Sequence, residues 1–183
     1  MSDSWVFLRE LLSRPKQVSA IAPSSRWLAR AMARDVGPAT GQVVEFGPGT
    51  GRLTEAILAT GVRPQDLSLF ELSGDFVTHL RRKFPGVTVI NEGAEKAGSL
   101  LPAKAGAVIS GLPLLSMPLG VRESIVRAAF DVLRPDGIYV QFTYGPWPPV
   151  SAEQIGRLGL QVRQTAFVWA NLPPARVFTF RRA

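Results

Sequence analysis

The residues best suited to bind a ligand lie in a glycine turn within Val43–Arg52. A β-branched pair at its start predicts a strand, and apolar residues at helical spacing over 53–58 predict a helix after it. Between them stand three glycines, which let a ligand approach the main chain closely: Gly47, Gly49 and Gly51. Glu71 lies twenty residues beyond the turn, at the end of a second predicted strand. A carboxylate there can accept both hydroxyls of a ribose.

The G-x-G-x-G spacing differs from the G-x-G-x-x-G of dinucleotide sites, and an acidic residue, Glu45, lies two positions before the first glycine. Together with Glu71, this pattern resembles the S-adenosylmethionine site of Rossmann-like methyltransferases. The resemblance implies S-adenosylmethionine as cofactor and S-adenosylhomocysteine as product. At the first two strand ends it implies contacts from Glu45, Gly47, Gly49, Gly51, Glu71 and Leu72.

Residues after the other predicted strands are further candidates, because ligands of open α/β sheets bind at the carboxyl ends of the strands. After the third strand, similar methyltransferases commonly carry Gly-Asp-Ala, and an acidic side chain often holds the adenine amino group. This chain has Glu92-Gly93-Ala94 instead. The adenine contact therefore falls to Glu95, to Glu92 or to the backbone at Ala94. Ser110, at the end of the fourth strand, is also expected at the cofactor.

The turn after the fourth strand lies opposite the glycine turn in such a sheet, and it predicts one wall of an acceptor pocket. Tyr144, after the fifth strand, can accept a hydrogen bond from an amine and present its ring to a developing cation. Trp147 is either part of this pocket or a packed aromatic, whereas Tyr139 is expected in the core. The remaining substrate contacts are Gly111, Leu112 and Pro113, with an apolar lining from Leu112, Leu114, Leu115 and Met117.

Methyl transfer from a sulfonium to an amine needs little acid–base apparatus. The donor is already activated, and the amine needs only to lose a proton, to be held in line and to be desolvated. No catalytic dyad is therefore expected. Tyr144 is the best polar candidate for orienting the amine, and Ser110 is the second residue assigned to catalysis.

Composition narrows the class of protein. At 183 residues and 46% hydrophobic content, the chain suits a single domain over 1–183, with N-terminal helices in 1–36. No cysteine and one histidine exclude disulfides and both thiolate and multi-histidine metal sites, so no metal is expected. The net charge of +7 favours a polyanionic partner, either nucleic acid or an anionic membrane surface. Without a membrane-spanning apolar run or a signal-peptide core, a cytoplasmic location is expected.

Residues 2–14 predict an amphipathic helix that ends before Pro15. Its apolar stripe with basic neighbours is typical of helices that bind in the membrane interface, and packing on its own domain is the alternative. About a dozen helical residues span roughly 18 Å, too short for the roughly 30 Å of bilayer hydrocarbon. The residues expected at the membrane are Trp5, Phe7, Leu8, Arg9, Leu12, Arg14 and Lys16.

Short apolar strands that alternate with helices predict an α/β fold with a mostly parallel sheet covered on both faces. Arg134–Gly137 predicts a turn, and 160–169 and 176–181 predict an antiparallel return at the sheet edge. The other expected strands are 42–46, 67–71, 88–91, 107–110 and 137–143. The expected helices are 26–34, capped by Ser24 or Ser25, then 53–60, 74–84 and 121–133.

Nearly the whole chain resembles bacterial phospholipid N-methyltransferases. The resemblance rests on Ile21–Ser25, Glu45–Gly51, Ser110–Leu115, Gln141–Pro146 and Asn171–Arg176. It implies a Rossmann-like class I methyltransferase with a seven-stranded sheet, which methylates phosphatidylethanolamine through mono- and dimethyl forms to phosphatidylcholine. It also implies a peripheral enzyme at the inner face of the cell membrane, docked on anionic lipid through the N-terminal helix.

Two alternatives remain. Ribosomal RNA adenine N6-dimethyltransferases have a similar cofactor half, but their motif after the fourth strand is similar to Asn-Leu-Pro-Tyr. This chain has Ser110–Leu114 there, with neither the amide nor the stacking ring, so a nucleic-acid partner is disfavoured. A non-catalytic, membrane-associated S-adenosylmethionine-binding protein is disfavoured because the three glycines and Glu71 are all intact.

Overall fold

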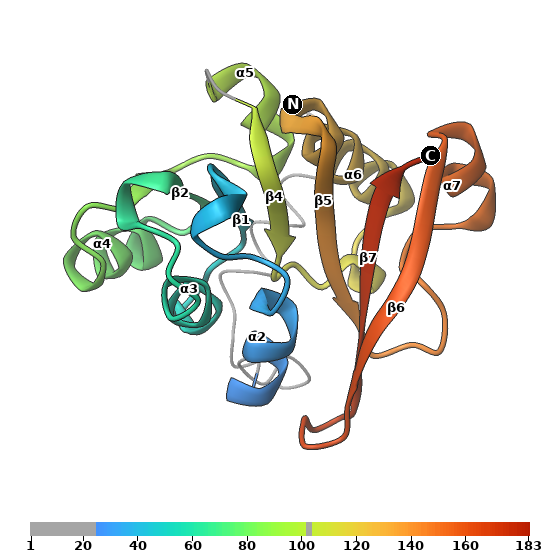
Figure 1. Ribbon diagram of the computed structural model, residues 1–183, viewed down its shortest axis with the longest axis horizontal. Coiled ribbons are helices and arrows are strands. Elements are labelled where there is room, and N and C mark those ends of the chain that lie inside the picture. Colours follow the sequence, from blue (N-terminus) through green and yellow to red (C-terminus); the bar gives the residue numbers. More distant parts are fainter. Residues whose placement is uncertain (1–24, 102–103) are drawn as a thin grey trace.

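The computed structural model describes residues 25–101 and 104–183 (Figure 1). The predicted helix at 2–14 and the membrane-contacting residues assigned between Trp5 and Lys16 lie outside the described residues.

A seven-stranded sheet forms the centre of the fold, with strand order β3-β2-β1-β4-β5-β7-β6 (Figure 1). The pairs from β3 to β5 are parallel, and β7 runs antiparallel to both β5 and β6. The predicted mostly parallel sheet with an antiparallel return is therefore confirmed. The strands are β1 (Val43–Phe46), β2 (Leu67–Phe70), β3 (Thr88–Ile90), β4 (Ala105–Ser110), β5 (Leu133–Thr143), β6 (Leu160–Val168) and β7 (Ala175–Arg182).

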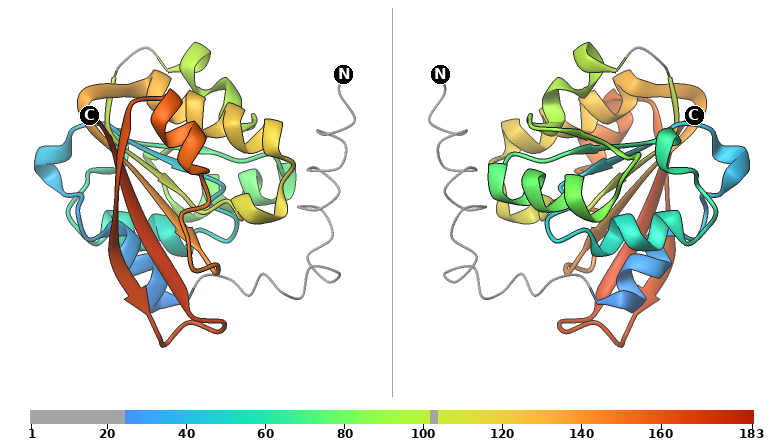
Figure 2. Two further views of the ribbon diagram at one scale, coloured as in Figure 1. Left: turned by 90° about the vertical axis from the view of Figure 1, so that its right-hand side faces the viewer. Right: turned by 90° about the vertical axis from the view of Figure 1, so that its left-hand side faces the viewer.

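Helices cover both faces of the sheet, as Figure 2 shows with α2 and α3 on one side and α6 and α7 on the other. On the first face lie α2 (Arg26–Ala33), α3 (Arg52–Leu58) and α4 (Gly74–Lys83), and on the second lie α5 (Ala97–Leu100), α6 (Leu119–Val132) and α7 (Ala152–Arg157). Short 3-10 helices are η1 (Pro38–Thr40), η2 (Pro64–Asp66), η3 (Ala94–Lys96) and η4 (Leu114–Ser116).

The core is split into two clusters by the sheet, because successive strand residues point to opposite faces. In β1, Val43 packs in the cluster under α2, α3 and α4, while Val44 and Phe46 pack in the cluster under α6. All four residues of β1 are buried. This two-sided burial is typical of parallel sheets and explains the continuous apolar runs in the sequence.

The observed elements differ from the predicted ones at the start of β5 and at two short helices. The residues predicted as a turn, Arg134–Gly137, form a bulge inside β5, because Leu133 already pairs with Ala105 and Ile138 pairs with Ala107. Gly106 alone thus lies opposite these four residues. The helices α5 and α7, with 4 and 6 residues, were not predicted, since neither is long enough to show a helical period.

Candidate active site

The glycine turn after β1 has the strand–turn–helix geometry that its spacing predicts. Its three glycines all have positive φ, at 68° for Gly47, 54° for Gly49 and 84° for Gly51. A Cβ on Gly47 would collide with the Leu112 side chain, and one on Gly51 with Phe84. At Gly49, by contrast, no atom of the described residues lies within 4 Å of a Cβ position. The middle of the turn is therefore the place where a ligand can lie against the main chain.

Glu71 joins the end of β2 to this open position. Its Oε2 accepts a hydrogen bond from the Gly49 N–H at 3.1 Å, and its Oε1 accepts one from the Ser73 N–H at 2.9 Å. Burial raises the pKa of the carboxyl, and the hydrogen bonds from these amides offset part of that rise. Each carboxylate oxygen has a second lone pair, so both can still accept from a neighbouring pair of hydroxyls.

Glu45 lies on the α3 side of β1 and is completely buried. Its Oε2 accepts a hydrogen bond from the Thr54 hydroxyl at 2.7 Å, which ties β1 to the first turn of α3. Its Oε1 has no hydrogen-bond partner within residues 25–101 and 104–183. Loss of hydration raises the pKa of this carboxyl to about 8, although the Thr54 hydrogen bond lowers it and the charge of Glu71 raises it further. Glu45 thus supports the glycine turn from inside the fold.

The segment after β3 brings its acidic side chains to different places. The Glu92 side chain is partly exposed and pairs with Lys96 at 2.7 Å. Glu95 instead folds back over Gly93, where a Cβ would collide with its carboxylate, and its buried Oε2 has no partner in the described part of the chain. Burial raises the pKa of the Glu95 carboxyl. Of the residues left open for the adenine contact, Glu95 has the free buried acceptor, while Ala94 is buried beside it.

One residue that sequence reasoning missed connects these strand ends. The Asn91 side-chain amide donates to the carbonyl oxygens of Glu71, at 2.9 Å, and Leu72, at 3.1 Å. It thereby fixes the end of β2 against the end of β3. A polar residue at the end of a predicted strand was the available signal, because such positions need hydrogen-bond partners.

The loop after β4 lies against the glycine turn, as predicted. The Gly111 N–H donates to the Phe46 carbonyl at 2.8 Å, and a Cβ on Gly111 would lie 2.9 Å from the Gly47 carbonyl oxygen. Only glycine therefore fits this close approach of two loops. Pro113 is the N-cap of η4, which follows this contact.

A buried polar network lies under that loop. Ser110 is fully buried, and its hydroxyl accepts from the Leu112 N–H at 3.4 Å. The Tyr139 hydroxyl donates to Gln141 Oε1 at 2.6 Å, and the Gln141 amide donates to the Leu112 carbonyl at 2.9 Å. Tyr139 is fully buried in the cluster under α6, which confirms it as a core residue, and this burial raises the pKa of its phenol. Gln141, which sequence reasoning quoted only within a motif, holds the loop from below.

Tyr144 follows β5 on the α2 face of the sheet. Its ring meets Phe142 edge-to-face at 5.3 Å. Its hydroxyl is buried and has no well-aligned hydrogen bond to any described residue. Burial raises the pKa of the phenol, and the nearby Asn171 side chain offsets part of that rise. The hydroxyl thus keeps hydrogen-bonding capacity beyond its contact with Asn171.

One expectation about the acceptor wall needs correction, and one alternative is excluded. Leu114 and Met117 are buried in the cluster under α6, because η4 turns them into the core, so they do not line an open wall. Trp147 is 77% exposed, so it is not a packed aromatic. No group of three or more His, Asp or Glu residues in the described chain is arranged to hold a metal ion. Among the helices of residues 25–101 and 104–183, none is long and apolar enough to cross a bilayer.

Several solved structures that match this fold are methyltransferases. The glycopeptide N-methyltransferase MtfA in complex with S-adenosylmethionine matches 89% of this chain and 96% of its own, with TM-score 0.69 and 16% identity. A TehB-like S-adenosylmethionine-dependent methyltransferase from Corynebacterium glutamicum matches 96% and 97%, with TM-score 0.65 and 15% identity. At such identities these likenesses establish the class I Rossmann-like fold.

Sequence comparison identifies the family. No known family profile matches the chain. A curated protein of Singulisphaera acidiphila, named ornithine lipid N-methyltransferase, is 30% identical over 190 residues, which cover 99% of this chain and 97% of that protein. The cofactor of the fold, S-adenosylmethionine, fits the open glycine turn with Glu71 beside it. The chain therefore belongs to the bacterial lipid N-methyltransferases, a family of S-adenosylmethionine-dependent enzymes.

Proposed function

We propose that the chain methylates the amine of phosphatidylethanolamine, and then its mono- and dimethyl derivatives, toward phosphatidylcholine. The observation that carries this proposal is the whole-length similarity to a lipid N-methyltransferase, together with a strand-end site built around Gly49 and Glu71. Ornithine lipid is the second candidate acceptor, because the curated relative is named for it. Both lipids present a primary amine near an anionic group, a phosphate in one and a carboxylate in the other.

The cofactor is assigned to the ends of β1, β2 and β3. When bound, S-adenosylmethionine supplies a methyl group on a sulfonium that an amine can attack directly. Glu71 accepts from the ribose hydroxyls. Glu95 accepts from the adenine amino group with its buried Oε2, which no described residue bonds. The open side of Gly49 leaves room for the cofactor against the main chain.

The acceptor is assigned to the ends of β4 and β5. Tyr144 orients the amine, because its hydroxyl is buried and can accept an N–H. The Gly111–Pro113 loop, held by Gln141, keeps water from the transfer path. Arg176 is the cation for the head-group anion, since its guanidinium lies beside the loop after β5 and donates to the Gly145 carbonyl at 3.3 Å.

The proposal includes the cellular setting. All 183 residues form one methyltransferase domain, and the enzyme works as a peripheral protein on the inner face of the cell membrane. The basic amphipathic pattern of residues 2–14 and the net charge of +7 support docking on anionic lipid.

The deciding experiment is incorporation of labelled methyl groups from S-adenosylmethionine into three acceptors offered in parallel. These are phosphatidylethanolamine vesicles, ornithine-lipid vesicles and ribosomal RNA. Label in phosphatidylethanolamine, with up to three methyl groups per head group, is the expected result. Label in ornithine lipid alone would make ornithine lipid the substrate in place of phosphatidylethanolamine. Label in RNA would overturn the assignment of a lipid substrate.

A matched pair of variants makes the result specific. Arg176→Gln is expected to raise KM for both lipids, since it removes the charge that pairs with the head-group anion. Arg163→Gln, on the exposed part of neighbouring β6, is the control and should leave KM unchanged. Cofactor bound with no acceptor methylated would identify the non-catalytic alternative.

A further inference from the structure

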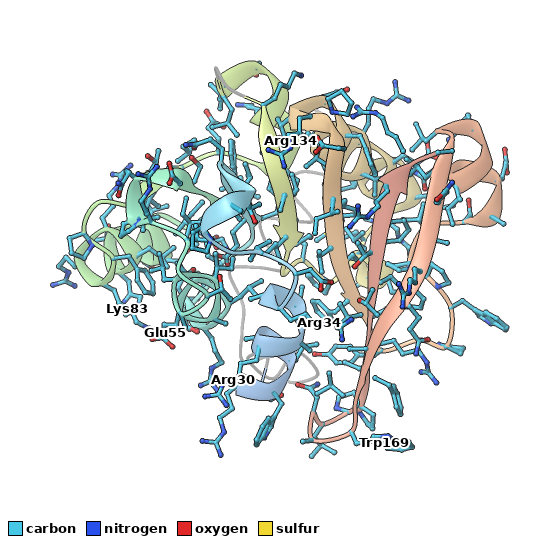
Figure 3. All side chains as sticks on the ribbon, viewed as in Figure 1. Arg30, Arg34, Glu55, Lys83, Arg134 and Trp169 are labelled. Carbon is cyan, nitrogen blue, oxygen red and sulfur yellow. The ribbon has the colours of Figure 1, made fainter. Side chains whose placement is uncertain are left out.

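Large apolar side chains are exposed together at one end of the molecule. The hairpin that joins β6 to β7 carries Trp169, 77% exposed, and Leu172, 86% exposed. Beside the hairpin lies α2, with Trp27 47% exposed. Figure 3 shows Trp169 and Arg30 at the same end of the molecule. Scattered exposed apolar residues are ordinary, but a group on adjoining elements indicates a binding surface.

The two elements are tied to each other. The Asn171 side-chain oxygen accepts from the Ser25 N–H at 3.1 Å, and its amide donates to the Pro173 carbonyl at 2.7 Å. Asn171 is buried, although its neighbours in the hairpin are exposed. The hairpin is therefore held in a fixed position at the N-terminus of α2.

The surface is basic as well as apolar. The guanidinium groups of Arg26 and Arg30 lie 5.2 and 5.8 Å from the Trp27 ring centroid. No acidic residue occurs in α2, and none occurs in the chain after Glu153. We name Arg26, Trp27, Arg30, Trp169 and Leu172 the hairpin–α2 surface.

We propose that the hairpin–α2 surface docks the enzyme on an anionic lipid bilayer. This inference rests on the proposed lipid substrate. Tryptophan is favoured at the boundary between hydrocarbon and head groups, and arginine is attracted to anionic lipid while its stem covers apolar surface. The surface also lies at the end where β4 and β5 terminate (Figure 1), so docking there turns the active site toward the bilayer. Ser25, the first residue that the structure describes, is part of the same junction.

The test is sedimentation of the full-length protein with phosphatidylglycerol vesicles. The double variant Trp169→Ser, Leu172→Ser should reduce the partition coefficient by about tenfold or more, since two apolar side chains no longer enter the interface. The double variant Arg26→Gln, Arg30→Gln should reduce it about fivefold per charge at low salt, and less at high salt. Matched controls at the opposite end are Leu100→Ser, which is 45% exposed, and Arg181→Gln. Both controls should bind as the wild type does.

A second measurement is independent of overall affinity. Bromine-labelled phosphatidylglycerol should quench the tryptophan fluorescence of the wild type, and Trp169→Phe should remove a part of that quenching. Unchanged vesicle binding in the hairpin variant, or unchanged quenching in Trp169→Phe, would overturn the proposal. So would a result in which only Trp5→Ser, Phe7→Ser releases the protein, or in which the surface variants lose RNA binding instead.

Turnover of a soluble short-chain phosphatidylethanolamine separates this inference from the proposed function. Docking predicts that the hairpin variant keeps the wild-type kcat/KM on the soluble lipid and loses activity only on vesicles. If the wild type methylates neither lipid form yet the hairpin variant still loses vesicle binding, the substrate proposal fails and the docking surface stands.

Discussion

The cofactor half and the acceptor half of this sheet are built in different ways. At the ends of β1, β2 and β3, side chains are tied to the backbone by hydrogen bonds. The buried Glu71 carboxylate accepts from the Gly49 N–H, and the Asn91 side-chain amide donates to the Glu71 carbonyl. At the ends of β5 and β6, the Tyr144 hydroxyl makes no well-aligned hydrogen bond to a described residue, and Trp147 and Trp169 are exposed. The first half is preformed for one ligand, whereas the second keeps groups that a lipid and its bilayer would satisfy.

The largest effect is expected at the middle of the glycine turn. Gly49→Val should weaken S-adenosylmethionine binding by at least about a hundredfold, close to 3 kcal/mol, because the side chain fills the space where the cofactor lies. Gly159→Val is a matched control, since its φ of 60° gives the same backbone strain and no described atom lies within 4 Å of its Cβ position. Calorimetric titration of both variants would test the contrast, which fails if both bind equally.

Glu45 offers a test of stability on the cofactor side. Its pKa of about 8 in the folded protein exceeds the value of 4.5 expected for an ordinary carboxyl. The folded state therefore holds the proton more tightly, so this contribution is fully present below about pH 4.5 and is lost as pH rises toward 8. Glu45→Gln mimics the protonated form and should be more stable than the wild type by on the order of 2 kcal/mol near pH 6, with little difference near pH 4. Urea unfolding of both proteins across this pH range measures the difference.

Variants of Glu71 test whether the cofactor half binds the ribose hydroxyls of S-adenosylmethionine. Glu71→Ala should reduce S-adenosylmethionine affinity roughly thirtyfold, the effect of losing hydrogen bonds to a charged acceptor. Glu71→Gln, which keeps one acceptor oxygen, should lose less. Wild-type affinity in the alanine variant, measured by titration, would refute the ribose assignment.

The smallest effect is expected at Tyr144, which tests the acceptor half of the sheet separately from the cofactor half. Tyr144→Phe should lower kcat about tenfold, within the range of one orienting hydrogen bond, and leave S-adenosylmethionine affinity unchanged. Its thermal stability should change little, because the hydroxyl that is removed makes no well-aligned hydrogen bond to a described residue. A loss of cofactor affinity in this variant would show that the two halves are not separate.

Local patterns explain why the cofactor half could be predicted from the sequence. Strand β1 and the turn after it depend on residues adjacent in the chain, and glycine at 47, 49 and 51 is required by backbone conformation there. The choice between Glu92 and Glu95 had a local signal that was not used. Glu92 and Lys96 stand four apart, a spacing that favours an ion pair and leaves Glu95 free.

The acceptor half depends on contacts between distant residues, which no local pattern contains. Leu114 and Met117 look like pocket residues in sequence, but η4 turns them into the core under α6. Arg134–Gly137 has turn residues, yet pairing of Leu133 with Ala105 draws it into β5 as a bulge. Whether Trp147 is a pocket residue or a packed aromatic depends on the path of its loop in space, which the sequence does not show.

The hydrogen bond between Ser25 and Asn171 joins residues 146 positions apart in the chain. A contact of such long range cannot form until the ribosome has released most of the sequence, and it forms late because loop closure must come first. The hairpin–α2 surface is thus assembled from an early and a late part of the nascent chain. A partly synthesised enzyme would consequently lack the complete surface and reach the bilayer by this route only after translation has passed the hairpin.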